Sequence, residues 1–207
     1  IWGNKIRVPL GEMIEVAVGR LKPELTEKVK KELISFIFQR ADNLLESEGV
    51  PVGIRRAVLN VEKEDLLSLR RKINALLEFL QQKDNQALLV GFTRVANILK
   101  QAKEKGLIPG EIDPVKLLET SELNLYRLLQ DQSGWLNDLY REGNYLGFLQ
   151  ALRQWSGPID RFFDEVLVMT SEKDLRDNRL GLLGKVNDIF LQMADFSEIS
   201  PEELGHA

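Results

Sequence analysis

The chain has 207 residues, of which 43% are hydrophobic and 29% are charged, a balance typical of a packed globular protein. It contains no cysteine, which excludes disulfide scaffolds, thiolate metal sites and cysteine nucleophiles. Its single histidine is His206, next to the C-terminal residue, which all but excludes catalytic triads and metal clusters built on histidine.

The net charge of −4 is unevenly distributed along the chain. Residues 1–110 carry 19 lysines and arginines against 14 acidic residues, whereas residues 111–207 carry 9 against 18. A mildly basic half beside an acidic half fits a polyanion that is bound by one face, and ordinary variation in surface charge is the alternative.

No apolar run approaches the roughly 20 residues of a membrane-spanning helix, and no signal-peptide pattern is found. We therefore expect a protein without a membrane partner. Because the sequence starts with Ile1 rather than methionine, we also expect it to begin inside a longer chain.

The first half of the chain shows helical spacing of apolar residues. A long helix is predicted after Pro23, because the apolar side chains from Leu33 to Leu45 recur at steps of one, three and four. Gly49 and Pro51 predict its end and a turn. Three further helices are predicted over residues 52–61, 65–80 and 85–105.

The clearest break in the helical pattern falls at residues 106–110, with the sequence GLIPG. Beyond it, helix starts are predicted at Asp113-Pro114, at residues 156–158, at Ser171 with Asp174 as a capping box, and at residues 200–203. The sequence shows neither a strand pattern with a period of two nor a repeat of 20–50 residues. It therefore predicts an all-α helical bundle.

The sequence contains no recognisable catalytic motif. The phosphate-binding loops GxxxxGK[ST] and GxGxxG, the nucleophile elbow GxSxG and the zinc motif HExxH are all absent. Paired acids such as Asp164-Glu165 are sequence neighbours that point about 100° apart on a helix, which indicates a solvated face. We therefore expect no catalytic site, no metal site and no cofactor in this chain itself.

Basic and amide side chains on the predicted helix 85–105 form the leading candidate for a binding site. Arg94, Asn97, Gln101 and Lys105 fall at positions i, i+3, i+7 and i+11, opposite the apolar stripe. Arginine and lysine bind phosphate, while asparagine and glutamine hydrogen-bond base edges or sugars. An ordinary solvated face is the alternative.

Two further basic clusters allow the same two interpretations: Arg55 with Arg56, and Arg70 with Arg71 and Lys72.

Aromatic and charged residues of the second half are candidates of a different kind. Phe162 and Phe163 are able to stack on unpaired bases, but both lie in the apolar stripe of their predicted helix, which fits core packing. Arg179 lies in register with Leu175 and Leu182, where an apolar residue is expected. We expect Arg179 to be mostly buried and paired with an acidic side chain or with helix-end carbonyls, and a ligand contact is the alternative.

Three stretches of the sequence resemble a known family. They are residues 92–100 (FTRVANILK), residues 159–169 (IDRFFDEVLVM) with 175–183 (LRDNRLGLL), and residues 38–59. They resemble the C-terminal region of the β subunit of bacterial tetrameric glycyl-tRNA synthetase, and the match in order covers roughly residues 25–199. The Phe-Phe-Asp-x-Val-x-Val-Met and Asn-Arg-Leu-x-Leu-Leu patterns, at the family's spacing, are its most specific part.

This resemblance implies a tRNA-binding role in an aminoacyl-tRNA ligase. It implies a fold similar to the helical anticodon-binding domain of arginyl-tRNA synthetases. We accordingly expect a connecting helical segment over residues 1–25 and an anticodon-binding-like domain over residues 26–207, with two lobes divided near 106–113.

The resemblance also implies the partners of the chain. These would be glycine tRNA and the α subunit of an α2β2 tetramer in the cytoplasm. ATP and Mg²⁺ would be bound by the α subunit, where aminoacylation would take place. Two alternatives stay open: the anticodon-binding module of an arginyl-type synthetase, and a helical protein–protein scaffold without a role in RNA binding.

Overall fold

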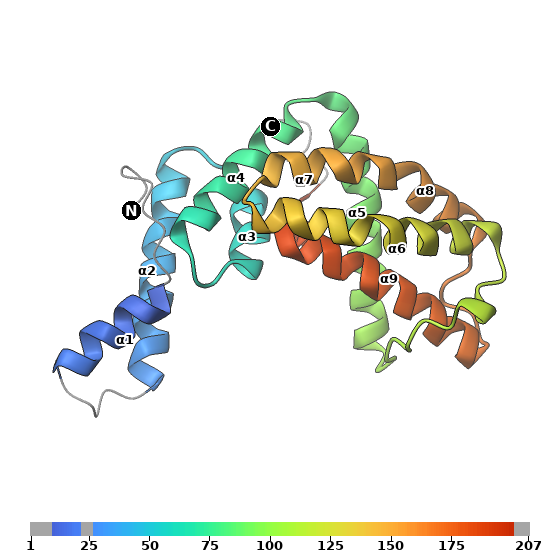
Figure 1. Cartoon of the computed structure of the whole chain (residues 1–207), viewed down its shortest axis with the longest axis horizontal. Coiled ribbons are helices and arrows are strands. Elements are labelled where there is room, and N and C mark those ends of the chain that lie inside the picture. Colours follow the sequence, from blue (N-terminus) through green and yellow to red (C-terminus); the bar gives the residue numbers. More distant parts are fainter. Residues whose placement is uncertain (1–9, 22–26, 201–207) are drawn as a thin grey trace.

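A computed structural model describes residues 10–21 and 27–200, and every regular element within them is a helix (Figure 1). The all-α fold class predicted from the sequence is confirmed for these residues. None of the helices in this part is long and apolar enough to cross a membrane. The α-helices are α1 (Leu10–Leu21), α2 (Glu27–Ser47), α3 (Val52–Val61), α4 (Leu66–Leu80), α5 (Lys83–Glu104), α6 (Thr120–Arg141), α7 (Tyr145–Ala151), α8 (Ser156–Glu165) and α9 (Lys173–Met193). Three short 3₁₀ turns are η1 (Pro114–Lys116), η2 (Leu152–Trp155) and η3 (Phe196–Glu198).

Side-chain caps explain where α4 and α6 begin. The carboxylate of Asp65 accepts hydrogen bonds of 2.8 and 3.1 Å from the backbone N–H groups two and three residues later, which satisfies free donors at the start of α4. The carboxylate of Glu122 accepts hydrogen bonds of 2.8 Å from the N–H groups of Leu118 and Glu119, at the entry to α6. The cap at α4 agrees with the helix start predicted at residue 65.

Two predicted helix starts differ from the structure. Asp113 acts as an N-cap, but it opens only η1, because the chain then extends until α6 begins. Ser171 and Asp174 form no capping box, since α9 begins at Lys173 and its N-cap residue makes no side-chain hydrogen bond. The short turn predicted at residues 200–203 lies, apart from its first residue, outside the described residues.

Helices from both halves of the chain share one hydrophobic core. α4 packs on α7, α5 crosses and packs on α8, α9 and η3, and α6 packs on α8 and α9 (Figure 1). The break at residues 106–113 is a loop between α5 and α6, so the two expected lobes are not packed separately. The largest fully buried aromatic side chains come from both sides of this loop: Phe79, Phe92, Phe148, Trp155, Phe162, Phe190 and Phe196.

The loop between α5 and α6 is held against α9. The N–H of Gly110 donates a hydrogen bond of 2.8 Å to the carbonyl of Asp177. The side-chain amide of Asn178 binds both the N–H and the carbonyl of Asp113, at 2.7 and 3.2 Å. The loop comes this close because Gly181 has no side chain, and a Cβ there would overlap the carbonyl oxygen of Gly110. This stretch of α9 belongs to the motif that carries the family resemblance, so part of that motif has a packing role.

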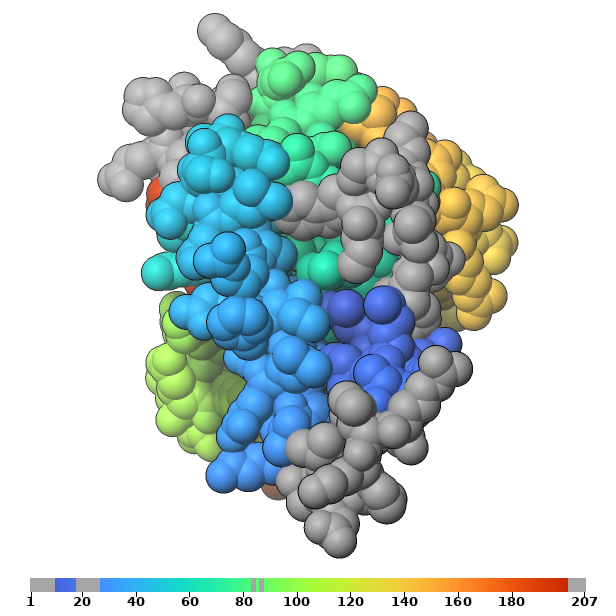
Figure 2. Space-filling model, turned by 90° about the vertical axis from the view of Figure 1, so that its left-hand side faces the viewer, coloured from blue at the N-terminus to red at the C-terminus, as the bar shows by residue number. Residues whose placement is uncertain are grey.

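α1 and α2 form one end of the molecule (Figure 1). α1 packs against α2, and the N–H of Leu10 donates a hydrogen bond of 3.1 Å to the carbonyl of Glu64. Figure 2 shows that α2 lies uncovered along this face. Among the apolar side chains of α2, Leu33 and Phe36 are exposed. The connecting segment expected over residues 1–25 therefore contains α1, a packed helix, and its other residues lie outside the described part of the chain.

Candidate nucleic-acid interface

The outer face of α5 brings the four leading candidates together. Arg94, Asn97 and Gln101 are exposed on the helix, and Lys105 is exposed at its C-cap. The opposite side of α5 is buried in the core through residues such as Phe92. The four side chains therefore share the solvent face, as their spacing predicts.

Arg94 is positioned by an aromatic ring from α8. Its guanidinium carbon lies 4.4 Å from the centre of the Phe163 ring, within the range of a cation–π contact. α8 approaches closely because α5 has Gly91 at the crossing, where an added Cβ would stand 3.3 Å from the side chain of Ile159. Phe162 is fully buried, whereas Phe163 is only partly buried. Of the two phenylalanines, Phe162 is thus a core residue and Phe163 belongs to the α5 surface.

An open groove with a volume of about 450 Å³ lies beside this face of α5. Its lining is formed by one side of α5 and by one residue that follows η3: Val90, Thr93, Arg94, Asn97, Ile98, Gln101 and Ile199. The hydroxyl of Thr93 donates a hydrogen bond of 3.2 Å to the carbonyl of Phe196, which ties η3 to α5 at the edge of the groove. Three of the four candidates, all except Lys105, therefore line one concave surface.

The first alternative basic cluster is divided between the interior and the solvent. Arg55 is buried, and its guanidinium donates to the carboxylates of Asp42 at 2.7 Å and Glu46 at 3.1 Å and to the carbonyl of Val50 at 2.8 Å. These contacts join α2 to α3 and occupy the guanidinium. Arg55 is therefore withdrawn as an RNA-binding candidate, while Arg56 is exposed.

The second alternative cluster is divided in the same way. Arg70 is partly buried and forms an ion pair with Glu48, and Arg71 is exposed on α4. Lys72 is 1% exposed and points into the interior. Of this cluster, Arg71 is the cation that stays on the open surface.

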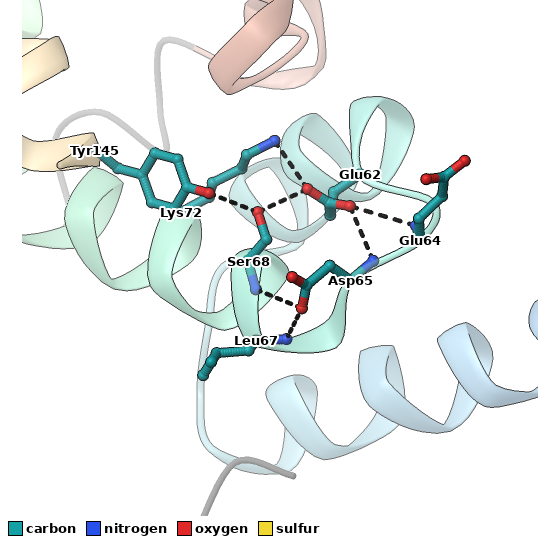
Figure 3. Close-up of polar contacts among 7 residues, drawn as sticks. All are labelled: Glu62, Glu64, Asp65, Leu67, Ser68, Lys72 and Tyr145. Atoms are coloured by element: carbon teal, nitrogen blue, oxygen red, sulfur yellow. Dashed lines mark hydrogen bonds and ion pairs between the residues drawn. The ribbon is translucent and has the colours of Figure 1, made fainter. Parts of the chain in front are cut away.

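Lys72 belongs to a buried polar network that joins α3, α4 and α7 (Figure 3). Its Nζ atom lies 3.0 Å from Oε2 of Glu62. Ser68 donates to the same carboxylate at 2.8 Å, so its oxygen accepts the 2.8 Å hydrogen bond from the hydroxyl of Tyr145. Nζ of Lys72 also lies 5.0 Å from the centre of the Tyr140 ring. The network has a partner for each of its charges, which indicates a structural role.

The pKa values of this pair move in opposite directions. Burial would lower the pKa of Lys72, but the carboxylate of Glu62 and the side chain of Tyr140 together outweigh burial, and the pKa of Lys72 is raised. Burial would raise the pKa of Glu62, but the ammonium of Lys72 and the hydrogen bond from Ser68 outweigh it, and the pKa of Glu62 is lowered. Both groups are therefore charged at neutral pH.

Arg179 has the environment that its place in an apolar stripe predicts. Its side chain is buried, and its Nε atom donates a hydrogen bond of 2.6 Å to Glu122, which is fully buried. Its Nη1 atom donates to the carbonyl of Leu167 at 3.0 Å. The guanidinium is committed to these contacts inside the protein, so Arg179 lies outside the candidate interface.

No three histidine, cysteine, aspartate or glutamate side chains among the described residues gather closely enough to hold a metal ion. The exposed cations, amides and aromatic ring on α5 and α8 are suited to bind phosphate and bases.

Comparison with known proteins identifies the family. The DALR anticodon binding domain matches residues 88–203, which is more than half of the chain. The chain belongs to this family. The match begins inside α5 and therefore includes the whole candidate surface of that helix, whereas α1 to α4 lie outside it. The domain start predicted at residue 26 lies N-terminal to this match and stays a prediction.

The chain is also similar to three curated glycine–tRNA ligase beta subunits. It is 36% identical to that of Moorella thermoacetica, over 84% of this chain and 24% of the relative. It is 32% identical to that of Syntrophus aciditrophicus, over 98% of this chain and 29% of the relative. It is 31% identical to that of Geotalea daltonii, over 97% of this chain and 29% of the relative. The chain therefore spans less than a third of the length of these relatives, and the similarity predicted from its motifs is confirmed.

Sequence reasoning missed two parts of the candidate surface. The role of Ile199 depends on the return of η3 to α5, which no local pattern reveals. The role of Phe163 depends on the α5–α8 crossing at Gly91. A glycine one turn before Arg94 was the available signal, because it allows a second helix to approach at that point.

Proposed function

We propose that this chain binds the anticodon arm of glycine tRNA as part of a glycine–tRNA ligase beta subunit. The observation that carries the proposal is the row of exposed side chains on α5, which lies within the anticodon-binding family match. The names of the similar beta subunits support glycine tRNA as the substrate and favour it over the arginyl-type alternative.

In this role the chain holds tRNA and performs no bond-making step. Arg94 and Lys105 would neutralise backbone phosphates, and Asn97 and Gln101 would contact bases or sugars. Holding the anticodon arm would place the distant acceptor end at a catalytic site on the α subunit of an α2β2 enzyme in the cytoplasm. That subunit would supply the site for ATP and Mg²⁺.

A binding experiment with two RNAs tests the proposal. The chain is titrated at low salt with a full glycine tRNA transcript and with a minihelix that has the acceptor stem and lacks the anticodon arm. We expect measurable binding of the full transcript and at least about tenfold weaker binding of the minihelix, because the phosphates that face α5 are missing. Equal binding of the two RNAs would contradict an anticodon-arm site.

Two further comparisons address the alternatives. Competition with arginine tRNA separates the glycine-specific role from the arginyl-type role, since we expect glycine tRNA to compete more strongly. A complete lack of tRNA binding at low salt would favour a helical protein–protein scaffold.

A further inference from the structure

The groove beside α5 is lined by both apolar and polar side chains. Val90, Ile98 and Ile199 supply apolar surface, while Arg94, Asn97 and Gln101 supply the polar groups. A nucleic-acid base also combines apolar faces with hydrogen-bonding edges. The chemical character of the groove therefore suits a base.

Arg94, which lines this groove, makes a cation–π contact with Phe163 of α8. The guanidinium carbon of Arg94 lies over the Phe163 ring, 4.4 Å from its centre, and the Arg94 residue is exposed. A planar cation that is already held by a ring is a rigid platform, and unpaired bases stack on arginine planes and on aromatic side chains.

Asn97 and Gln101 continue from this platform along the helix. Both are exposed, and neither side-chain amide has a hydrogen-bond partner within residues 27–200. Each amide offers a donor and an acceptor, which is what the edge of a base requires. At about 1.5 Å per residue, the step from Arg94 to Gln101 spans roughly 10 Å, the length of about three stacked bases.

The charges at the far end of α5 suit the phosphates of the same strand. Lys105 is exposed there on the side of the helix that carries Arg94 and Gln101. Lys100 and Glu104 are exposed beside that side, and Lys103 is exposed on the opposite one. On α8 the acidic residues Asp160 and Asp164 are exposed, and the carboxylate of Asp160 accepts a hydrogen bond of 3.5 Å from the hydroxyl of Ser156. The surface thus has excess positive charge at one end and a stacking platform at the other.

We propose that this groove is a binding site for unpaired RNA bases, with one base stacked on Arg94 over Phe163 and base edges hydrogen-bonded by Asn97 and Gln101. The inference rests on the proposed function and deepens it, since it assigns base reading to a defined site. Phosphate contacts alone would hold any RNA, whereas this site would make affinity depend on bases in the loop.

The test uses a hairpin RNA with the sequence of the anticodon arm of glycine tRNA. In a set of variants, each loop nucleotide in turn is made abasic, which removes one base and keeps every phosphate. For the wild-type chain we expect at least one abasic position to weaken binding by about 5- to 150-fold, the range for loss of one stacked base. Removal of the other loop bases should change affinity less.

The protein side of the test uses Phe163→Leu and the double variant Asn97→Ala/Gln101→Ala. Each should weaken binding of the intact hairpin and have little further effect on the hairpin that lacks the critical base. The matched control is Asn124→Ala/Gln150→Ala, which removes two exposed amides on α6 and α7. It should bind both RNAs as the wild type does, and thermal melting of each variant reports whether it is folded.

The outcomes separate this inference from the proposed function. Fully additive losses from the abasic position and from the Phe163 and Asn97/Gln101 variants would overturn the base site, while binding of the arm itself would stand. Equal losses on every hairpin would also overturn it, because the side chains would then contact the RNA backbone. If the wild-type chain bound neither hairpin nor tRNA, the proposed function would fail together with this inference.

Discussion

Arg179 joins α9 to the first turn of α6 through a hydrogen bond of 2.6 Å from its Nε atom to Oε1 of Glu122. The other carboxylate oxygen accepts the N–H groups of Leu118 and Glu119, and Nη1 of the arginine donates to the carbonyl of Leu167. One buried ion pair therefore fixes the loop before α6, the start of α6, the segment after α8 and α9 itself.

Replacement of Arg179 by methionine should destabilise the protein strongly. The variant keeps a long apolar side chain but leaves the fully buried carboxylate of Glu122 without its cation. Loss of one partner of a buried pair costs about 3–5 kcal/mol in the free energy of unfolding. Urea titration measures this loss. The control is Lys185→Met, which removes an exposed cation of α9 that is 3.7 Å from Asp188, and its effect should stay below about 0.5 kcal/mol.

The ion pair of Lys72 and Glu62 should make stability depend on pH at both extremes. Glu62 has a lowered pKa, so its contribution is present above the unfolded value of about 4.3 and is lost as the pH falls through the folded-state pKa. Lys72 has a raised pKa, so its contribution is present below about 10.4 and is lost as the pH rises through the folded-state pKa.

The double variant Glu62→Gln/Lys72→Met should therefore show a flatter profile of unfolding free energy against pH than the wild type. Urea titrations from about pH 3 to pH 11 measure both profiles. Lys63→Met/Glu64→Gln is the matched control, because it removes the same charges from exposed neighbours. Identical profiles for the wild type and the Glu62/Lys72 variant would contradict the assigned pKa directions.

Two glycines of α9 should respond in opposite ways to the same substitution. A Cβ at Gly181 would overlap the carbonyl oxygen of Gly110, whereas a Cβ at Gly184 would stand 4.0 Å from Pro109, an ordinary contact. Gly181→Ala should cost about 1–3 kcal/mol, because backbone must move. Gly184→Ala should be neutral or stabilise by up to about 1 kcal/mol through helix propensity. Equal melting temperatures for the two variants would count against the close packing of the loop on α9.

The chain alone should not activate glycine. It has no glycine-rich phosphate loop, and phosphoryl transfer requires clustered groups that stabilise developing charge. We expect no glycine-dependent ATP–pyrophosphate exchange from the purified chain. We also expect little recovery of charging when it is added to a catalytic subunit without the rest of the beta subunit. Exchange above the level of a no-protein blank would overturn the non-catalytic role.

Local patterns predicted the elements and the burial of some charges. The helix over residues 52–61 matches α3, because apolar spacing and Pro51 act locally. Arg179 was predicted to be buried because it interrupts a regular stripe. The same reasoning applies to Lys72, which lies three residues after Leu69 and four before Leu76 on the buried face of α4. This spacing in the sequence was a sufficient signal to predict that Lys72 is buried.

Features that depend on contacts between distant segments could not be read from the sequence. Arg55 is the first residue of the basic pair Arg55-Arg56, and its acidic partners lie on α2. Its burial therefore depends on the packing of α2 on α3, which the local sequence does not show. The groove beside α5 requires η3 to return from more than ninety residues away. Helical periodicity places Arg94, Asn97, Gln101 and Lys105 on one face of α5. The positions of Phe163 and Ile199 beside that face become known only from the three-dimensional structure.

The salt dependence of tRNA binding tests the central claim most directly. Association constants for glycine tRNA are measured at several salt concentrations for the wild type, for Arg94→Glu/Lys105→Glu, and for Lys173→Glu as an exposed charge reversal outside α5. We expect the slope of log K against log salt to flatten by about 0.7–0.9 for each lost phosphate contact in the α5 variant, with weaker binding, and to stay unchanged in the control. Unchanged affinity and slope in the α5 variant would contradict the α5 interface and move the RNA surface to Arg56 and Arg71.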